Sequence, residues 1–123
     1  MATYKDLDVF KRSYKLALKI HKLSFKLPKE LQYDLADQIR RASRSIPSNI
    51  AEGYSRNKSS KDKINFLNSA LGSNDEVLLN LKFMKDSDLI SEKDFQDFFK
   101  EYTICGKQLS QLIKSLKTSK PEN

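Results

Sequence analysis

The chain has 123 residues and a formal net charge of +7, a size that suits one domain with a single hydrophobic core. Three glycines and three prolines are few for a protein built on tight turns, so long regular elements are expected. No apolar stretch approaches the roughly 20 residues that cross a bilayer, and no apolar signal region follows Met1. We therefore expect a cytoplasmic protein that makes no membrane contact.

Two helices are predicted in the first half of the chain. The first has apolar residues at spacings of three and four and ends before Pro28; its stripe is Leu7, Phe10, Tyr14, Ala17, Leu18, His21 and Phe25. The second begins near Lys29 or Glu30 and ends at Gly53; its stripe is Leu31, Leu35, Ile39, Ala42, Ile46 and Ile50. This stripe keeps its phase on both sides of Pro47, which predicts one helix bent at the proline.

Two further helices are predicted after a polar connection over residues 53–61. The third is capped by Ser59 or Ser60 and runs to about Asp86, with Gly72 and Ser73 as small positions that a neighbouring helix could approach closely. The fourth begins at a run resembling a capping box, residues 91–94. Its stripe is Phe95, Phe98, Tyr102, Cys105, Leu109, Leu112 and Leu116.

Short connections force consecutive helices to run in opposite directions. The sequence therefore predicts an all-α, antiparallel up-down-up-down four-helix bundle, with a single domain over residues 1–118 and a disordered tail at 119–123. Cys105 is the only cysteine and lies within an apolar stripe, so it is interpreted as a small core residue.

Positive charge is concentrated in the first predicted helix. Residues 9–29 contain seven basic residues and no acidic one, while basic and acidic residues balance elsewhere. The candidate nucleic-acid-binding residues are Lys11, Arg12, Lys15, Lys19, Lys22 and Lys26. At about 100° per residue, the five lysines occupy a sector of roughly 80°, a lengthwise basic band. The band favours binding of RNA or DNA phosphates, although the alternative is a solvated face or one neutralised by Asp94, Asp97 and Glu101.

A polar stripe runs along the second helix and faces polar positions of the third. Its members are Gln38, Arg41, Ser45, Asn49 and Glu52, and the positions expected opposite it are Ser73 and Glu76. Gly53, which ends the same motif, is counted with this network. We interpret them as a structural network in which Arg41 pairs with Glu76, while Ser45 and Asn49 satisfy backbone groups freed by Pro47.

The motif that contains this stripe, QIRRASRSIPSNIAEG at residues 38–53, resembles the signature of a known protein family. This is the family of four-helix-bundle proteins encoded in intervening sequences of bacterial large-subunit rRNA genes, which is related to the accessory protein of diversity-generating retroelements. Supporting matches are YKDLDVF at 4–10, Leu27-Pro28, Phe66-Leu67, residues 70–73 and Glu76, and Phe10 departs from a frequent tryptophan. The resemblance spans nearly the whole chain. It implies a homopentameric assembly. The accessory protein of the related branch works with a reverse transcriptase and binds nucleic acid, but this activity does not carry over to the present chain, because the matched residues are fold residues and no catalytic set is defined for the family.

No catalytic or cofactor site is predicted. His21 is the only histidine, and we interpret it as a packed or interface residue, since its helix offers no acidic partner for a metal beyond Asp8. We expect no enzyme activity, no metal, no cofactor and no small-molecule substrate.

Two functions from different classes remain open. The favoured one is a non-catalytic homo-oligomer that binds RNA or DNA with low sequence specificity, because lysine acts as a point charge. The alternative is a protein-interaction or assembly scaffold with no nucleic-acid role. Self-association is predicted from apolar residues outside the main stripes, namely Val9, Leu16, Ile20, Leu23, Phe83, Phe99 and Ile104.

Overall fold

The structure, a computed structural model, describes residues 3–118 and is all-α over that range. Its four long helices are α1 (Asp8–Ser24), α2 (Leu35–Gly53), α3 (Ser60–Asp86) and α4 (Glu92–Thr118). Two short 3-10 helices, η1 (Tyr4–Asp6) and η2 (Lys29–Leu31), precede α1 and α2. The predicted four-helix, all-α fold is confirmed. The predicted tail at 119–123 lies outside the described residues.

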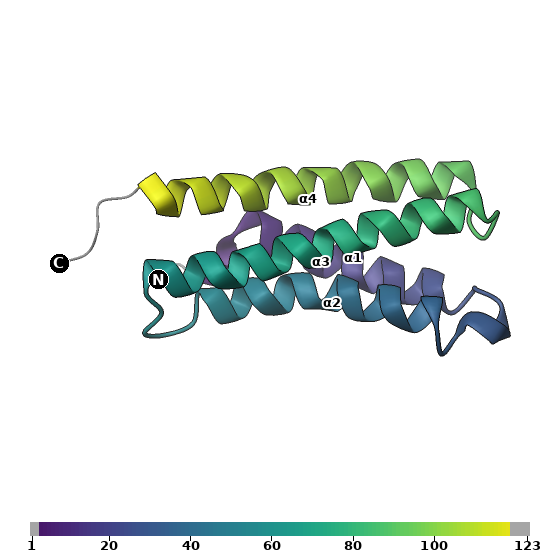
Figure 1. The fold of residues 1–123 in the computed structure, drawn as a ribbon, viewed down its shortest axis with the longest axis horizontal. Helices are drawn as coiled ribbons and strands as arrows, with labels where there is room; N and C mark the ends of the chain where they lie inside the picture. Colours follow the sequence, from purple (N-terminus) through teal and green to yellow (C-terminus); the bar gives the residue numbers. More distant parts are fainter. Residues whose placement is uncertain (1–2, 119–123) are drawn as a thin grey trace.

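Each helix packs against the next one along the chain. The closest packing joins α2 to α3, α3 to α4 and α1 to α2, while α1 and α4 meet more loosely. In Figure 1 each helix lies back along the preceding one, an arrangement compatible with the predicted up-down-up-down order. The start of α1, the α2–α3 connection and the end of α4 share one end of the bundle, which we call the open end (Figure 1). The α3–α4 turn lies at the opposite end.

The core is a single apolar cluster to which all four helices contribute. Its largest fully buried side chains are Tyr102, Ile20, Ile39, Ile46, Ile50, Leu67, Leu81, Met84 and Leu109. A buried hydrogen bond crosses it, since Asn74 Nδ2 on α3 donates to the Tyr102 carbonyl on α4 at 2.9 Å. The predicted stripes of α2 and α4 supply a large part of this core, and on α4 Ile113 is buried where Leu112 and Leu116 are half-buried.

The buried face of α1 differs from the predicted one. Val9, Leu16 and Ile20, which were expected to be left over for subunit contacts, are 0–4% exposed and form the core face. Tyr14 and Leu18, expected in the core, are more than half exposed. The helix carries two apolar stripes, and the one that is buried also contains the small residue Ser13, which lets neighbouring helices approach. Apolar periodicity alone does not distinguish two such stripes.

The other apolar residues predicted for subunit contacts divide differently. Phe83 is 57% exposed, as that prediction requires. Leu23, Phe99 and Ile104 are half-buried, and the first two pack against the core.

Helix α2 begins later than predicted but continues through its proline. Residues 29–31 form η2, and the α-helix begins at Leu35 after Asp34 departs from helical backbone angles. Pro47 lies inside the helix, which confirms one element on both sides of it. The delay has a physical cause, because Arg40 holds the α1–α2 connection in a separate shape. Its guanidinium donates to Ser24 Oγ at 2.8 Å and to the Gln32 carbonyl at 2.8 Å.

Side-chain caps define the starts of α3 and α4. Ser59 Oγ accepts from the Asp62 backbone N–H at 3.1 Å, and Asp62 Oδ2 accepts from the Ser59 N–H, a complete capping box. Ser91 Oγ accepts from the Asp94 N–H at 3.0 Å in the same way.

The close approach of a neighbouring helix that was expected at Gly72 is wrong, since a Cβ placed there would meet nothing within 4 Å.

Candidate functional site

The predicted basic band of α1 divides into residues with different surroundings. Lys11 and Lys15 are exposed. Arg12 is half-buried and already paired, because its Nη1 lies 2.6 Å from Glu101 Oε1 on α4 and its Nη2 lies 3.4 Å from Asp8 Oδ2. Burial is the largest single influence on the pKa of the Arg12 guanidinium and lowers it, but the hydrogen bonds and charges of Glu101 and Asp8 together outweigh burial and leave this pKa raised. Arg12 is therefore a structural cation that joins α1 to α4.

The remaining lysines of the band face acidic residues of α4. A shallow cavity between α1 and α4 is lined on one side by Lys19, Lys22 and Lys26, and on the other by Asp94, Asp97 and Glu101. Asp97 also accepts a hydrogen bond from Lys93 at 2.8 Å, which is the main reason that its pKa is lowered; Lys19 adds a smaller contribution. This part of the band has the acidic neighbours that the alternative interpretation required.

The fold gathers a second group of basic residues at the open end of the bundle. This group, the basic end, comprises Lys5, Arg56, Lys58, Lys61, Lys63, Lys114 and Lys117, from η1, the α2–α3 connection, the start of α3 and the end of α4. The half of the chain toward this end, residues 3–16, 44–73 and 105–118, contains 12 basic and 4 acidic residues. The other half, residues 17–43 and 74–104, contains 10 basic and 11 acidic residues. The charge is thus polarised along the bundle.

Acidic residues near the basic end have other partners. Asp6 and Asp62 cap helices, and Glu52 accepts a hydrogen bond from Ser55. Asp8 accepts from Gln108 Nε2 at 2.6 Å, the main cause of its lowered pKa, and pairs with Arg12. Within residues 3–118, no ion pair involves a member of the basic end.

Two lysines of the basic end rest on aromatic rings. Lys58 Nζ lies 5.0 Å from the centre of the Phe66 ring, and Lys63 Nζ lies 5.4 Å from that of Tyr54. A ring face attracts a cation without removing its charge. These contacts orient the ammonium groups and leave the positive potential of the basic end in place.

The predicted polar stripe is assembled only in part. Ser73 Oγ donates to Ser45 Oγ at 2.9 Å across α2 and α3, and Asn49 Nδ2 donates to the hydroxyl and carbonyl of Ser45. Arg41, however, is largely exposed and lies 3.7 Å from Asp37 within its own helix, in place of the predicted pair with Glu76.

The rest of the stripe lies around that contact. Gln38, Arg41, Ser45, Ser73 and Glu76 line a shallow polar cavity on the surface. Gln38 donates to Asp34 at 3.2 Å. Gly53 is buried against α3, where a Cβ would lie 3.0 Å from Phe66 Cβ. Glu52, next to it, is exposed.

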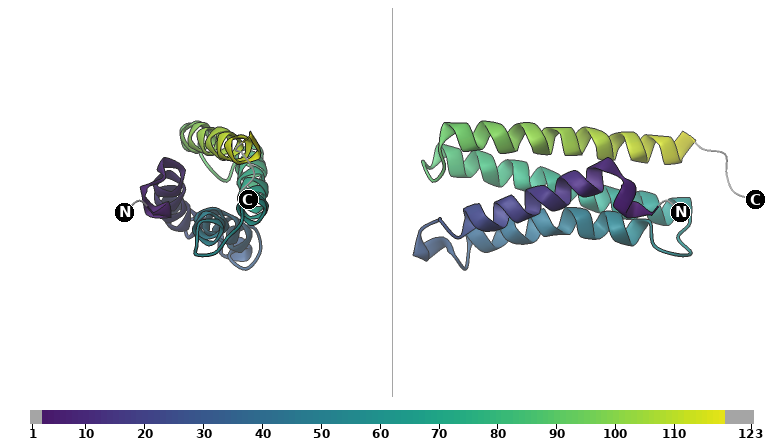
Figure 2. Two further views of the ribbon diagram at one scale, coloured as in Figure 1. Left: turned by 90° about the vertical axis from the view of Figure 1, so that its left-hand side faces the viewer. Right: turned by 180° about the vertical axis from the view of Figure 1, so that it is seen from behind.

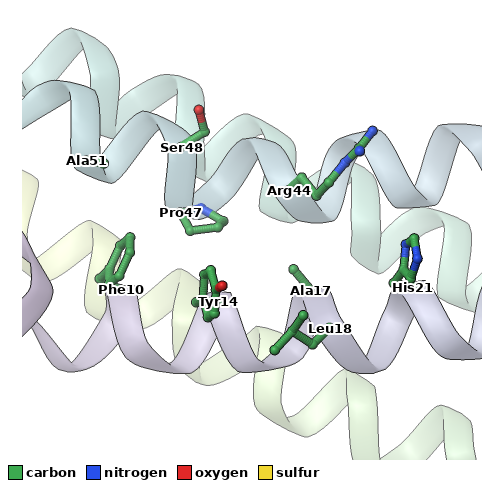
Figure 3. Close-up of a pocket in the computed structure, with 9 residues that line it drawn as sticks. All are labelled: Phe10, Tyr14, Ala17, Leu18, His21, Arg44, Pro47, Ser48 and Ala51. Atoms are coloured by element: carbon green, nitrogen blue, oxygen red, sulfur yellow. The ribbon is translucent and has the colours of Figure 1, made fainter.

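An apolar groove lies between α1 and α2 on the outer surface. We call it the α1 groove; it encloses about 470 Å³ and is lined by Phe10, Tyr14, Ala17, Leu18, His21, Arg44, Pro47, Ser48 and Ala51. Figure 3 shows Phe10 and Tyr14 on α1 pointing toward Pro47 on α2. His21, which was predicted to be a packed or interface residue, lines the groove. Its ring packs edge-on against that of Phe25, with the ring centres 4.9 Å apart.

The reactive side chains are held in unreactive surroundings. Cys105 is fully buried, and burial raises the pKa of its thiol to about 12. Burial also raises the pKa of Tyr102, beside it in the core. Among the described residues no group of three or more histidine, cysteine or acidic side chains is placed to hold a metal ion. None of the helices in that range is both long and apolar enough to span a bilayer.

The sequence analysis predicted neither the basic end nor the α1 groove. The basic end combines short segments from three parts of the chain, so the number of charged residues in any single segment does not reveal it. One signal was available: from Tyr102 to Thr118, α4 contains three lysines and no acidic residue. The groove had a signal too, since α1 has more apolar positions than one face can hold.

Comparisons with known proteins agree with this fold. A comparison with curated proteins gives no match. A crystal structure of a protein of unknown function from the S23 ribosomal protein family of Bacteroides thetaiotaomicron superposes with a TM-score of 0.76. It is 29% identical in sequence, over 86% of this chain and 95% of that one. The family model described as 23S rRNA-intervening sequence protein matches residues 5–111. The chain therefore belongs to the 23S rRNA-intervening sequence protein family.

Proposed function

We propose that this chain is a cytoplasmic, non-catalytic, homo-oligomeric protein, built as an antiparallel up-down-up-down four-helix bundle, that binds RNA or DNA with low sequence specificity. The main support for this proposal is the polarised charge of the bundle, with 12 basic and 4 acidic residues in the half toward the open end. Phosphate groups would bind there because the lysines and Arg56 form no ion pair within residues 3–118.

The proposal moves the main contact surface from the α1 band to the basic end. Arg12 is engaged by Glu101, and Lys19, Lys22 and Lys26 face acidic side chains, so these four positions offer less free charge than their number suggests. Lys11 and Lys15 are exposed on the half of α1 nearer the basic end and extend it along the side of the bundle. Repetition of this surface in an oligomer, with a pentamer suggested by the family resemblance, multiplies weak phosphate contacts.

The test compares two variants that lose the same charge at opposite ends. One replaces Arg56, Lys61 and Lys117 with Gln, and the matched control replaces Lys29, Lys93 and Lys100 with Gln; all six residues are exposed. Binding to RNA and DNA oligonucleotides of two unrelated sequences is measured at several salt concentrations. We expect the first variant to bind more weakly, and its plot of log K against log salt to have a slope that is less steep by up to about 3. The control should keep nearly the wild-type slope.

Two results would contradict the proposal. Equal loss in both variants would mean that net charge alone, without a defined surface, attracts the nucleic acid. Absence of wild-type binding even at low salt would remove the nucleic-acid role.

A second candidate function is favoured by the α1 groove. An exposed apolar groove is typical of a surface that binds another protein, and a protein-interaction or assembly scaffold needs no nucleic acid. An intact oligomer without any nucleic-acid binding would select this candidate.

A further inference from the structure

The bundle exposes large apolar side chains on α1 and α3, two helices that are not adjacent in it. On α1, Tyr14 and Leu18 are 52% and 53% exposed and line the α1 groove. On α3, Leu79 and Phe83 are 69% and 57% exposed and form a second surface, the α3 ridge. Within the described residues no Cα atom of α1 lies within 8 Å of one on α3, and Figure 2 shows the two helices across the bundle from one another. One chain thus carries two separate, unpartnered apolar surfaces.

The apolar side chains of the two surfaces have the same spacing along their helices. Phe10, Tyr14 and Leu18 are spaced by four residues and form one wall of the groove, with Pro47 and Ala51 of α2 opposite. Leu79 and Phe83 are also spaced by four residues and project as a ridge. Packing of a four-residue ridge into a groove between such rows is the commonest way for helices to pack.

The charges around the two surfaces are complementary. Arg44 lines the groove and is exposed, and no ion pair within residues 3–118 includes it. The α3 ridge follows Asp75 and Glu76, which are exposed one turn before Leu79 and likewise have no ion pair in that range. A docked ridge would bring these carboxylates toward Arg44 at the groove.

We propose that the α3 ridge of one copy of this chain packs into the α1 groove of the next. The inference rests on the proposed homo-oligomer and specifies how its subunits meet. Since groove and ridge are different surfaces, every subunit uses one to receive a neighbour and the other to be received. Because α1 and α3 lie across the bundle from one another (Figure 2), a single neighbour cannot occupy both surfaces of one subunit, so such contacts close into a ring or continue as a fibre.

The test uses two variants that each block one surface. Leu18→Glu places a charge in the groove and Leu79→Glu places one on the ridge; both residues are more than half exposed, so the fold should persist. Tyr33→Glu is the matched control, because Tyr33 is 98% exposed and belongs to neither surface. Masses are measured by light scattering after size exclusion, and circular dichroism checks folding.

We expect the wild type and Tyr33→Glu to form the same oligomer of at least three subunits, and each blocked variant to be monomeric. Mixed in equal amounts, Leu18→Glu and Leu79→Glu should form a one-to-one heterodimer, because the mixture retains one working ridge and one working groove. If either blocked variant misfolds, Arg44→Glu and Glu76→Arg replace the pair and should likewise associate only when mixed.

Three results would overturn the inference. If Leu79→Glu keeps the wild-type mass while Leu18→Glu loses it, the groove has a different occupant. If the mixed variants stay monomeric, groove and ridge do not bind each other. A monomeric wild type would instead contradict the proposed homo-oligomer itself, which separates the two failures.

Discussion

Arg40 shows how one side chain can fix a connection that the sequence left undefined. Its Nη1 donates to Ser24 Oγ and to Gln32 Oε1, its Nη2 donates to the Gln32 carbonyl, and its guanidinium lies 4.5 Å from the centre of the Phe25 ring. The end of α1 and Gln32, the residue that follows η2, are thereby tied to α2. No neighbouring residue in the sequence indicates this role, because its partners lie 8 to 16 positions away.

Replacing Arg40 should therefore destabilise the bundle, whereas replacing its neighbour Arg41 should not. Arg40→Ala removes three hydrogen bonds and leaves Ser24 and Gln32 without their donor. We therefore expect the free energy of unfolding to fall by about 1 to 3 kcal/mol. Arg41→Ala removes a long, exposed contact and should change stability by less than about 0.5 kcal/mol. Urea unfolding followed by circular dichroism measures both. A large loss in Arg41→Ala would restore the originally predicted pair with Glu76.

Cys105 makes the stability of the core dependent on alkaline pH. Its thiol pKa is about 12 in the folded chain against a reference of 9.0, so folding favours the protonated form. The contribution is complete below pH 9 and is lost as the pH rises toward 12, since the unfolded chain releases the proton first. At pH 10 the stability lost through this ionisation amounts to roughly 1 kcal/mol.

The measurement is the urea midpoint at pH 7 and at pH 10 for the wild type and Cys105→Ala. The variant is expected to be less stable at both values but to decline less between them. An identical decline in the two proteins would show that the thiol ionises equally in the folded and unfolded states. Thiol reagents provide a second check, because they should modify Cys105 only as the chain unfolds.

At the scale of elements, helix α1 shows what apolar periodicity can and cannot predict. The extents of α1, α3 and α4 agree with the sequence prediction within a few residues, because their stripes and caps are local features. The buried face of α1 was assigned wrongly, since Val9, Leu16 and Ile20 and the alternative set of Phe10, Tyr14 and Leu18 both repeat at helical spacing. Only the position of α2 and α4 decides between them.

A pair of substitutions on α1 tests this assignment directly. Ile20 is fully buried, so Ile20→Ala should lower stability by about 2 to 4 kcal/mol through lost packing and a cavity. Leu18 is 53% exposed, and Leu18→Ala should cost well under about 1 kcal/mol in the isolated chain. Thermal melts at low protein concentration, where association does not contribute, compare the two. The reverse order would return Leu18 to the core.

Two glycines in helices give a second element-level comparison. Gly72 has open space where a Cβ would stand, so Gly72→Ala should stabilise α3 by roughly 0.5 to 1 kcal/mol. At Gly106 a Cβ would lie 3.2 Å from Asn74 Nδ2, which is committed to its hydrogen bond with the Tyr102 carbonyl. Gly106→Ala should therefore leave the stability of the bundle unchanged or lower it. Equal gains at both positions, in the same unfolding assay, would mean that Asn74 moves freely.

For the whole molecule, the sequence predicted the architecture and only part of the candidate site. Four periodic segments joined by short connections were enough for the all-α bundle, and the family motif was recognisable in residues 38–53. The basic end was not predictable by the same means, because Lys5, Arg56 and Lys117 come together only through the packing of four helices. The acidic partners of the α1 lysines depended on that packing too, and they were foreseen only as an alternative.

The start of the first helix and the end of the last helix lie at the same end of the bundle, which has a practical consequence for experiments on this protein. The start of α1 and the end of α4 lie at the open end, beside the α2–α3 connection. A fluorescent protein or affinity tag fused to either terminus is therefore delivered to the surface where we place the nucleic acid, and it would screen or crowd that surface. Insertion into the turn between α3 and α4, at residues 87–91, would carry the label on the far side of the bundle. Binding measured with terminal labels and with labels in that turn should differ for this reason alone.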